Sequence, residues 1–475
     1  MENFGCRATQ ADGAAIERQL LEKGLSRAIE AHDAEVVVLN TCTVTASADQ
    51  DARATIRRIH RDNPNARILV TGCYAQRAPQ EIAALPGVSL VVGNSHKHQL
   101  ADIATHNGGF VPLASVTANP QSSHVVVGDI FAHTELLAAP VFDADTASEK
   151  TRPNLKVQDG CNNRCSFCII PFVRGKSRSL RPDEIIREVN SLVANGYREI
   201  VLSGINLGRW GRDLGTALPN SAEQGLSRLV EQGFSPAFQP TYRLEASASE
   251  VRRPRFVDLL RAILDHTSIE KLRISSVEPM DWSNDLIELA AFSPRVCKHA
   301  HVPLQSGSDR ILRKMHRRYR PWHYADRIAR IRDAMPTAAI GADVMVGFPG
   351  ETDEDFEQTR SFIESLPFTY LHVFTYSSRP GTPSSEMAEQ VPVQIARERN
   401  RILRELAAAK KRAFQEQFIG SELQAITLTN RHSGRTEALT DNFQKLWLDG
   451  IHEPNQLITA RFTNIEGDAL TGEAS

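Results

Sequence analysis

The chain has 475 residues, enough for two to four domains, and its formal net charge of −2 provides no overall positive field for nucleic acid. With 41% hydrophobic and 24% charged residues it has the composition of a soluble protein, without an apolar run of the roughly 18 residues that span a bilayer. The N-terminus lacks the basic start and apolar core of a signal peptide, so we expect a cytoplasmic protein. Seven cysteines, an odd and sparse number, argue against a disulfide framework and favour metal binding or catalysis.

Residues 1–116 alternate between strand-like and helix-like patterns, which predicts a parallel α/β sheet with crossover helices. Residues 117–152 are of mixed composition and are predicted to be a linker. The predicted strands are 35–40, 66–72 and 88–93, and the predicted helices are 13–30, 47–62 and 78–85.

A second series of strands and helices covers residues 153–392, apart from an insertion at 216–252, and predicts a partial (β/α)6 barrel. A basic helix is expected at 393–419, and short alternating strands at 420–475 predict a small β-barrel. The six strands expected in the larger barrel are 154–158, 199–203, 271–275, 299–303, 339–345 and 370–374.

Three cysteines lie close together after the strand predicted at 154–158, in the segment DGCNNRCSFC. A short loop can wrap the thiolates of Cys161, Cys165 and Cys168 around one face of an iron–sulfur cluster. A structural zinc site needs a fourth ligand, and no second Cys or His pair follows the loop. Three ligands leave one iron open for direct binding of a substrate.

Three further cysteines follow predicted strands that are far apart in the sequence. Cys42 comes after the strand at 35–40, Cys73 after the strand at 66–72, and Cys6 ends a short segment at the start of the chain. The carboxyl ends of adjacent parallel strands face one crevice, so these thiols could form a second three-ligand site. Buried free cysteines also serve as small hydrophobic residues, and position alone leaves both interpretations open.

Polar residues end two of the strands of the predicted barrel. Ser203 and Gly204 could contact a bound cofactor, whereas Ser276 and Glu278 could hold ribose hydroxyls. A turn or a surface acid would give the same pattern.

Other polar residues are assigned a structural role. His299 and His301 alternate on one strand and are expected to be core or hydrogen-bonding residues, and Cys297 is expected to take no part. The glycine-rich turn at 347–352 opens a helix, where backbone could approach a ligand.

Two basic stretches could bind RNA despite the neutral total. Residues 310–333 hold nine Lys and Arg against two Asp, with three aromatic residues between them, and residues 397–412 hold seven against two Glu. A basic run is also typical of a solvated helix face. The residues predicted to contact RNA are Arg313, Lys314, Arg317 and Arg318.

The spacing of Cys161, Cys165 and Cys168 resembles the C-x-x-x-C-x-x-C signature of the radical S-adenosylmethionine (SAM) superfamily. The resemblance implies that the open iron of a [4Fe–4S] cluster chelates SAM and that its reductive cleavage yields a 5′-deoxyadenosyl radical. Phe167 matches the aromatic position that packs near the adenine of SAM.

Nearly the whole chain is similar to the radical SAM methylthiotransferases. The similarity lies in NFGCRATQAD (3–12), NTCTV (40–44), TGCYAQ (71–76), LKVQDGC (155–161), CIIPFVRG (168–175), HVPLQSGS (301–308) and DVMVGFPGET (343–352). It implies that Cys6, Cys42 and Cys73 hold a second [4Fe–4S] cluster and that residues 420–475 form a TRAM-like RNA-binding barrel. That segment carries four basic and eight acidic side chains, which is unusual for an RNA-binding module.

Within this family, LSGINLG (202–208) resembles the threonylcarbamoyladenosine branch. The implied activity is insertion of a methylthio group at C2 of N6-threonylcarbamoyladenosine at position 37 of tRNA, next to the anticodon. The implied partners are tRNA, an external reductant such as a flavodoxin or ferredoxin, and an unidentified sulfur donor, with a monomeric enzyme and no membrane. The alternatives are methylthiolation of isopentenyladenosine in tRNA, methylthiolation of a ribosomal-protein aspartate, and a non-catalytic iron–sulfur scaffold.

Overall fold

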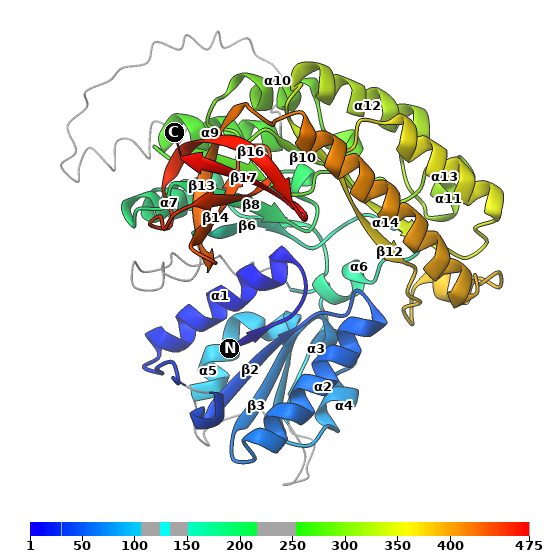
Figure 1. Ribbon diagram of the computed structural model, residues 1–475. Helices are drawn as coiled ribbons and strands as arrows, with labels where there is room; N and C mark the ends of the chain where they lie inside the picture. The colour runs from blue at the N-terminus through cyan, green and yellow to red at the C-terminus, as the bar shows by residue number, and fades with distance from the viewer. Residues whose placement is uncertain (30, 106–123, 134–150, 216–252, 475) are drawn as a thin grey trace, which may run out of the picture.

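The computed structural model of the chain describes residues 1–29, 31–105, 124–133, 151–215 and 253–474. It consists of an amino-terminal α/β domain, a central β/α domain and a carboxyl-terminal β-barrel (Figure 1). The predicted insertion at 216–252 and most of the predicted linker lie outside the described residues. Among the described helices, none is both long enough and apolar enough to cross a membrane.

The amino-terminal domain is a five-stranded parallel sheet with the order β1-β2-β3-β4-β5. Its apolar core forms because strands such as VVVLNT and RILVTG are buried along most of their length. The predicted linker contributes the fifth strand, because three of its residues pair with β4. The elements are β1 (Glu2–Asn3), α1 (Arg7–Glu22), β2 (Val36–Thr41), α2 (Ala46–Asp62), β3 (Arg67–Gly72), α3 (Cys73–Arg77), α4 (Pro79–Ala83), β4 (Val88–Gly93), α5 (Leu100–Thr105) and β5 (His124–Val126).

Helix α1 begins at Arg7 and ends at Glu22, whereas the sequence pattern placed this helix at 13–30. Gly24 lies just past its end with φ of 88°, a left-handed conformation that glycine adopts at little cost and that stops the helix. The early start puts the first turn of α1 directly after Cys6.

The central domain has six parallel strands in two pieces, β6-β8-β9 and β10-β11-β12, with the short β7 antiparallel to β6. A bridge between Leu272 and Val296 lies between the two pieces, which confirms the predicted partial barrel. The strands are β6 (Asn154–Asp159), β7 (Arg178–Ser179), β8 (Glu199–Gly204), β9 (Lys271–Ile274), β10 (His299–His301), β11 (Ala339–Val346) and β12 (Tyr370–Thr375). The α-helices are α6 (Ile170–Arg174), α7 (Pro182–Ala194), α9 (Phe256–His266), α10 (Asn284–Phe292), α11 (Asp309–Lys314), α12 (Pro321–Ala334) and α13 (Asp353–Ser365).

The long helix α14 (Val393–Glu416) packs on β12 and leads into a closed barrel in which the strands follow the order β13-β14-β15-β17-β16. Both the helix and the barrel were predicted. The barrel packs back on the central domain through a shared apolar cluster that includes Ala339, Phe414 and Phe462. Its strands are β13 (Glu422–His432), β14 (Arg435–Thr440), β15 (Lys445–Asp449), β16 (Leu457–Glu466) and β17 (Ala469–Ala474).

Candidate functional site

A cavity of about 730 Å³ lies at the carboxyl ends of the central strands, where a β/α barrel places its active site. All three parts of the molecule line it. The amino-terminal domain supplies Cys6 and Arg7, the first residue of α1; the three-cysteine loop supplies Cys161, and the carboxyl-terminal barrel supplies Phe443. We refer to this space as the central cavity.

Cys161, Cys165 and Cys168 all line the central cavity. Burial, with a smaller contribution from the neighbouring Cys165, raises the pKa of the Cys168 thiol to about 12. A high pKa disfavours the thiolate form that binds metal. A bound cation stabilises that form and so deprotonates the thiols that hold it. Polar groups already approach these sulfurs: Arg317 Nη1 lies 3.3 Å from Cys165 Sγ, and Asn206 Nδ2 lies 3.5 Å from Cys161 Sγ. Three thiols facing a cavity fit a three-ligand iron–sulfur cluster with one open iron.

Cys6, Cys42 and Cys73 follow β1, β2 and β3, which are adjacent and parallel. Gly5, with φ of 98°, lets the chain pass so close to Cys42 that an added Cβ would lie 2.8 Å from its Sγ. Burial raises the pKa of Cys42 to about 12, and the nearby thiols of Cys73 and Cys6 add to this increase. The three cysteines therefore meet at one end of the sheet, as their positions predicted.

The residues predicted to bind SAM also line the central cavity: Phe167, Ser203, Gly204, Ser276 and Glu278. The Oγ of Ser203 is buried and has no hydrogen-bond partner among the described residues, so it is available to a ligand. Glu278 pairs with Arg317, which holds its carboxylate beside the three-cysteine loop. Ser276 Oγ lies 2.6 Å from His301 Nδ1.

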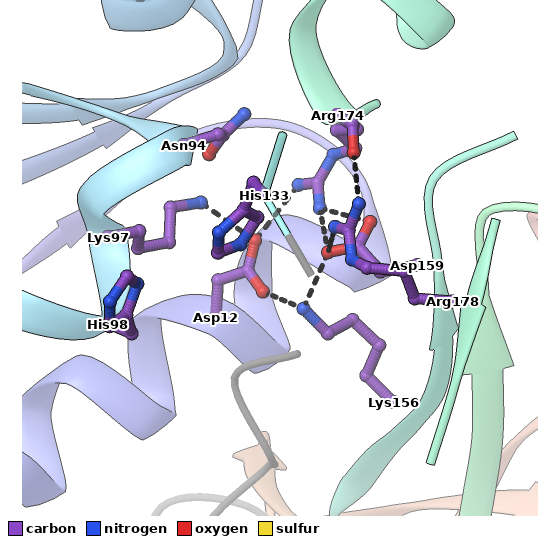
Figure 2. A pocket seen from close by; sticks show the side chains of 9 residues that line it. All are labelled: Asp12, Asn94, Lys97, His98, His133, Lys156, Asp159, Arg174 and Arg178. Atoms are coloured by element: carbon purple, nitrogen blue, oxygen red, sulfur yellow. Dashed lines mark hydrogen bonds and ion pairs between the residues drawn. The ribbon is translucent and has the colours of Figure 1, made fainter. Parts of the chain in front are cut away.

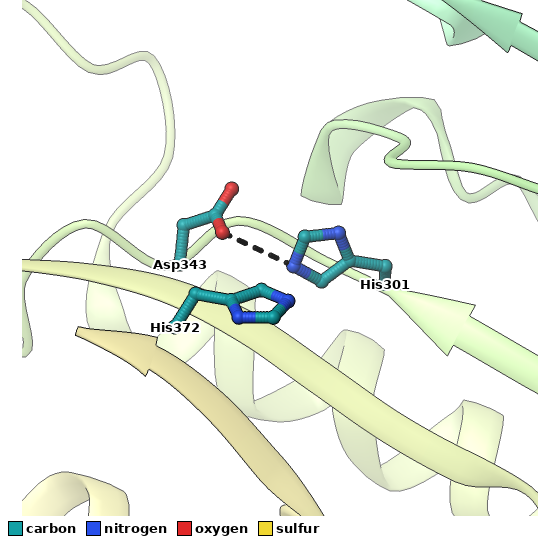
Figure 3. A group of neighbouring side chains, drawn as sticks. All are labelled: His301, Asp343 and His372. Carbon is teal, nitrogen blue, oxygen red and sulfur yellow. Dashed lines mark ion pairs between the residues drawn. The ribbon is translucent and has the colours of Figure 1, made fainter. Parts of the chain in front are cut away.

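Two histidines that were expected to have only a structural role lie in the wall of the central cavity. His299 and His301 line the cavity, together with Asp343, Tyr370 and His372, which were not singled out. The ligand atoms of His301, Asp343 and His372 all lie within 4.8 Å of one another, and His301 Nε2 is 3.3 Å from Asp343 Oδ1 (Figure 3). Polar residues alternate along β10 and at the start of β12, and Asp343 is the single polar side chain of β11; this pattern could have indicated the wall.

Behind the amino-terminal cysteines, five buried charged residues join the first two domains (Figure 2). The carboxylate of Asp12 on α1 pairs with Lys97 at 2.9 Å, with Arg174 at 3.0 Å and with Lys156. Asp159 pairs with Arg174 at 2.9 Å and with Lys156 at 3.0 Å. Burial alone would raise the pKa of Asp12, but Lys156, Lys97 and Arg174 outweigh it and hold that pKa well below its ordinary value.

Two family models match the chain: "Radical SAM superfamily" over residues 155–363 and "Uncharacterized protein family UPF0004" over residues 1–93. The chain is 35% identical over 457 residues to "Threonylcarbamoyladenosine tRNA methylthiotransferase MtaB" of Aquifex aeolicus, a match that covers 96% of this chain and 98% of that protein. The chain belongs to the radical SAM methylthiotransferase family. It is an enzyme that transfers a methylthio group, and it uses a [4Fe–4S] cluster and SAM.

Other methylthiotransferases are similar over comparable lengths. The protein of the same name from Bacillus subtilis is 34% identical, with 95% of this chain and 90% of that protein covered. A "tRNA-2-methylthio-N(6)-dimethylallyladenosine synthase" of Nocardia farcinica is 32% identical, with 100% and 88% covered. Among solved structures, the radical SAM methyltransferase TsrM from Kitasatospora setae is 16% identical, covers 78% of this chain and 66% of its own, and superposes with a TM-score of 0.47.

The residues predicted to bind RNA divide between the surface and the interior of this methylthiotransferase. Arg313 and Arg318 are exposed, and Lys314 is half-buried and pairs with Glu389. Arg317 is only 8% exposed and pairs with Glu278, so its assignment to an RNA-binding surface was wrong. Of the three aromatic residues in this stretch, Tyr319 and Tyr324 are buried, and Trp322 is exposed.

Proposed function

We propose that this methylthiotransferase modifies tRNA, inserting a methylthio group at C2 of N6-threonylcarbamoyladenosine next to the anticodon, at position 37. The observation that carries the proposal is the central cavity, which is lined by Cys6 of one cysteine group and by Cys161, Cys165 and Cys168 of the other. A single nucleoside in this cavity would face both groups. The family relatives whose names specify threonylcarbamoyladenosine support this substrate.

We assign Cys161, Cys165 and Cys168 to the cluster that binds SAM, and Cys6, Cys42 and Cys73 to a second [4Fe–4S] cluster. When bound, the cluster at Cys161 and SAM supply the one-electron chemistry that an unactivated aromatic C–H bond requires. Phe167, Ser203, Gly204, Ser276 and Glu278 would hold SAM beside it, since they line the same space. Arg7 and Phe443 of the barrel line the same cavity.

The remaining partners follow from the reaction. Reduction of the cluster requires an external electron donor such as a flavodoxin or ferredoxin, and the inserted sulfur requires a donor that this chain does not identify. We propose a cytoplasmic, monomeric enzyme whose exposed basic residues, Arg313 and Arg318 among them, contact tRNA phosphates.

Nucleoside mass spectrometry of tRNA from a deletion strain tests the substrate. Loss of the chain should remove the methylthio form of N6-threonylcarbamoyladenosine and leave its unmethylthiolated precursor. The intact gene should restore the product, and Cys161→Ala should not. Loss of a methylthio group from isopentenyladenosine, or from a ribosomal-protein aspartate, would assign the enzyme to one of those branches instead.

The isopentenyladenosine alternative has support of its own, because synthases of that class are similar over the full chain. The two substrates differ in chemistry: an isopentenyl group is apolar, whereas a threonylcarbamoyl group carries a carboxylate and a hydroxyl. One wall of the central cavity is polar and favours the threonylcarbamoyl group. It contains Arg7, His299, His301, Asp343 and His372.

A further inference from the structure

Arg7 is the first residue of α1 and lines the central cavity. Its side chain is only partly exposed, yet among the described residues its guanidinium has no hydrogen-bond or ion-pair partner. Only its backbone is engaged, since the Arg7 carbonyl accepts a hydrogen bond from Asn154 Nδ2 at 2.6 Å. A partly buried guanidinium that faces a cavity without a partner is costly, and an anionic ligand removes that cost.

Among the described residues, the carboxylate that acts most on Arg7 is that of Glu199. The cations Arg152 and Arg273 lower the pKa of Arg7, after the larger effect of burial. The carboxylate of Glu199 already pairs with these two arginines. Arg273 Nε donates to Glu199 at 2.8 Å, and Arg152 Nη1 lies 3.6 Å from the same side chain. Glu199 therefore pairs with two other arginines, and the guanidinium of Arg7 has no ion-pair partner among the described residues.

The strands β10, β11 and β12 bring further polar groups to this side of the cavity. His372 is exposed to the cavity and, like Tyr370 and His299, lies within electrostatic range of Arg7. Asp343 pairs in register with His372 and points toward His301 (Figure 3). A carboxylate here accepts hydrogen bonds, which a substrate hydroxyl or N–H can donate.

We propose that Arg7 binds the carboxylate of the threonylcarbamoyl group on the target adenosine and that Asp343 and His372 bind its hydroxyl, so that these residues determine substrate specificity. The inference rests on the proposed function and deepens it, because an isopentenyl group offers neither partner. Arg7 adjoins Cys6, so the recognised side chain would lie beside the amino-terminal cysteines. The contact would fix which face of the adenine meets them.

The test uses the full-length, iron-loaded enzyme and two anticodon stem-loops, one with N6-threonylcarbamoyladenosine and one with its methyl ester. Wild-type enzyme should bind the acid about 10- to 100-fold more tightly than the ester, the range of a charge-assisted hydrogen bond. Arg7→Gln should bind both with equal affinity, and Arg7→Lys should regain part of the preference. Arg18→Gln, an exposed arginine on the same helix that pairs with Glu22, is the matched control and should keep the wild-type ratio.

The readout is the dissociation constant from fluorescence anisotropy, measured without reductant and alongside iron content. An acid-to-ester ratio near one in the wild-type enzyme, or a ratio unchanged by Arg7→Gln, would overturn the inference. That outcome is distinct from failure of the proposed function, in which the wild-type enzyme makes no methylthio product from the threonylcarbamoyl stem-loop. If Arg7→Gln lowers iron content, the comparison of acid and ester with Arg7→Lys still decides the question.

Discussion

The six cysteines that line up at strand ends and in the DGCNNRCSFC loop fall into two groups from different domains. Cys6 is exposed, Cys42 and Cys73 are buried, and the three loop cysteines lie between these extremes. Each group has three thiols, so each can hold a four-iron cluster with one iron left open.

We expect about eight iron atoms per chain after anaerobic reconstitution, because two four-iron clusters are proposed. Replacing Cys6, Cys42 and Cys73 together by Ala should halve the iron, and the triple variant at Cys161, Cys165 and Cys168 should also halve it. The first variant should still cleave SAM reductively. Iron and acid-labile sulfide analysis provides the measurement. Full iron content in the variant at Cys6, Cys42 and Cys73 would contradict the assignment of a second cluster to these residues.

Arg317 and Arg318 are sequence neighbours with opposite environments. Arg317→Gln should leave Glu278 without its partner, destabilise the fold by about 1–3 kcal/mol and weaken SAM binding, with no effect on the salt dependence of tRNA binding. Arg318→Gln should leave SAM binding unchanged and reduce the slope of log affinity against log salt by about one. Isothermal titration with SAM and tRNA binding across a salt series measure both, and reversed results would put Arg317 on the RNA surface.

The sequence predicted the cysteines better than it predicted the rest of the site. Thiolates have few roles, so three of them at strand ends and three in one short loop indicate metal ligands. Arginine has many roles, and no sequence pattern separates Arg313, on the surface, from Arg317, beneath it. Arg7, Asp343 and His372 were missed because the fold brings them to one cavity from elements far apart in the chain.

Helix α1 is the element that connects the amino-terminal domain to the site. Its first turn lines the central cavity. Asp12, in the second turn, lies within the buried charged network. The sequence predicted a helix here but began it six residues late, because the small residues of the first turns look like a loop. The buried network could not be predicted, since three of its five members belong to the next domain.

Asp12→Asn should destabilise the protein by about 3–5 kcal/mol, since it leaves Lys97, Lys156 and Arg174 with one carboxylate among them. Glu22→Gln, at the exposed end of the same helix, removes only a surface ion pair with Arg18 and should cost less than about 0.5 kcal/mol. Anaerobic urea unfolding followed by circular dichroism compares the two. Equal effects would mean that the network does not hold the domains together.

At the scale of the whole molecule, the carboxyl-terminal barrel forms part of the wall of the central cavity. Phe443 stacks on His299 with ring centroids 4.4 Å apart, and Arg273 donates to the carbonyls of Thr440 and Asp441 at 3.1 Å. The sequence predicted the barrel but not this contact. The acidic balance of residues 420–475 is easier to understand if part of the barrel serves as a wall of the active site, because a wall needs no positive field.

Variants at two aromatic residues test whether the barrel serves as a wall of the active site or as an RNA-binding surface. Phe443 lines the cavity, whereas Trp447 on β15 is partly exposed, lies outside the cavity lining and has Lys445 over its ring at 4.9 Å. Phe443→Ala should raise the KM for substrate tRNA about 3- to 10-fold, the range of one lost aromatic contact, and should leave the salt dependence of binding unchanged because no charge is lost. Trp447→Ala should leave that KM unchanged.

The measurement is steady-state methylthiolation of tRNA at several salt concentrations, with reductive SAM cleavage in the absence of RNA as the check on cluster loading. If Trp447→Ala weakens tRNA binding and Phe443→Ala has no effect, the barrel binds RNA by stacking on its outer face and does not serve as a wall of the site.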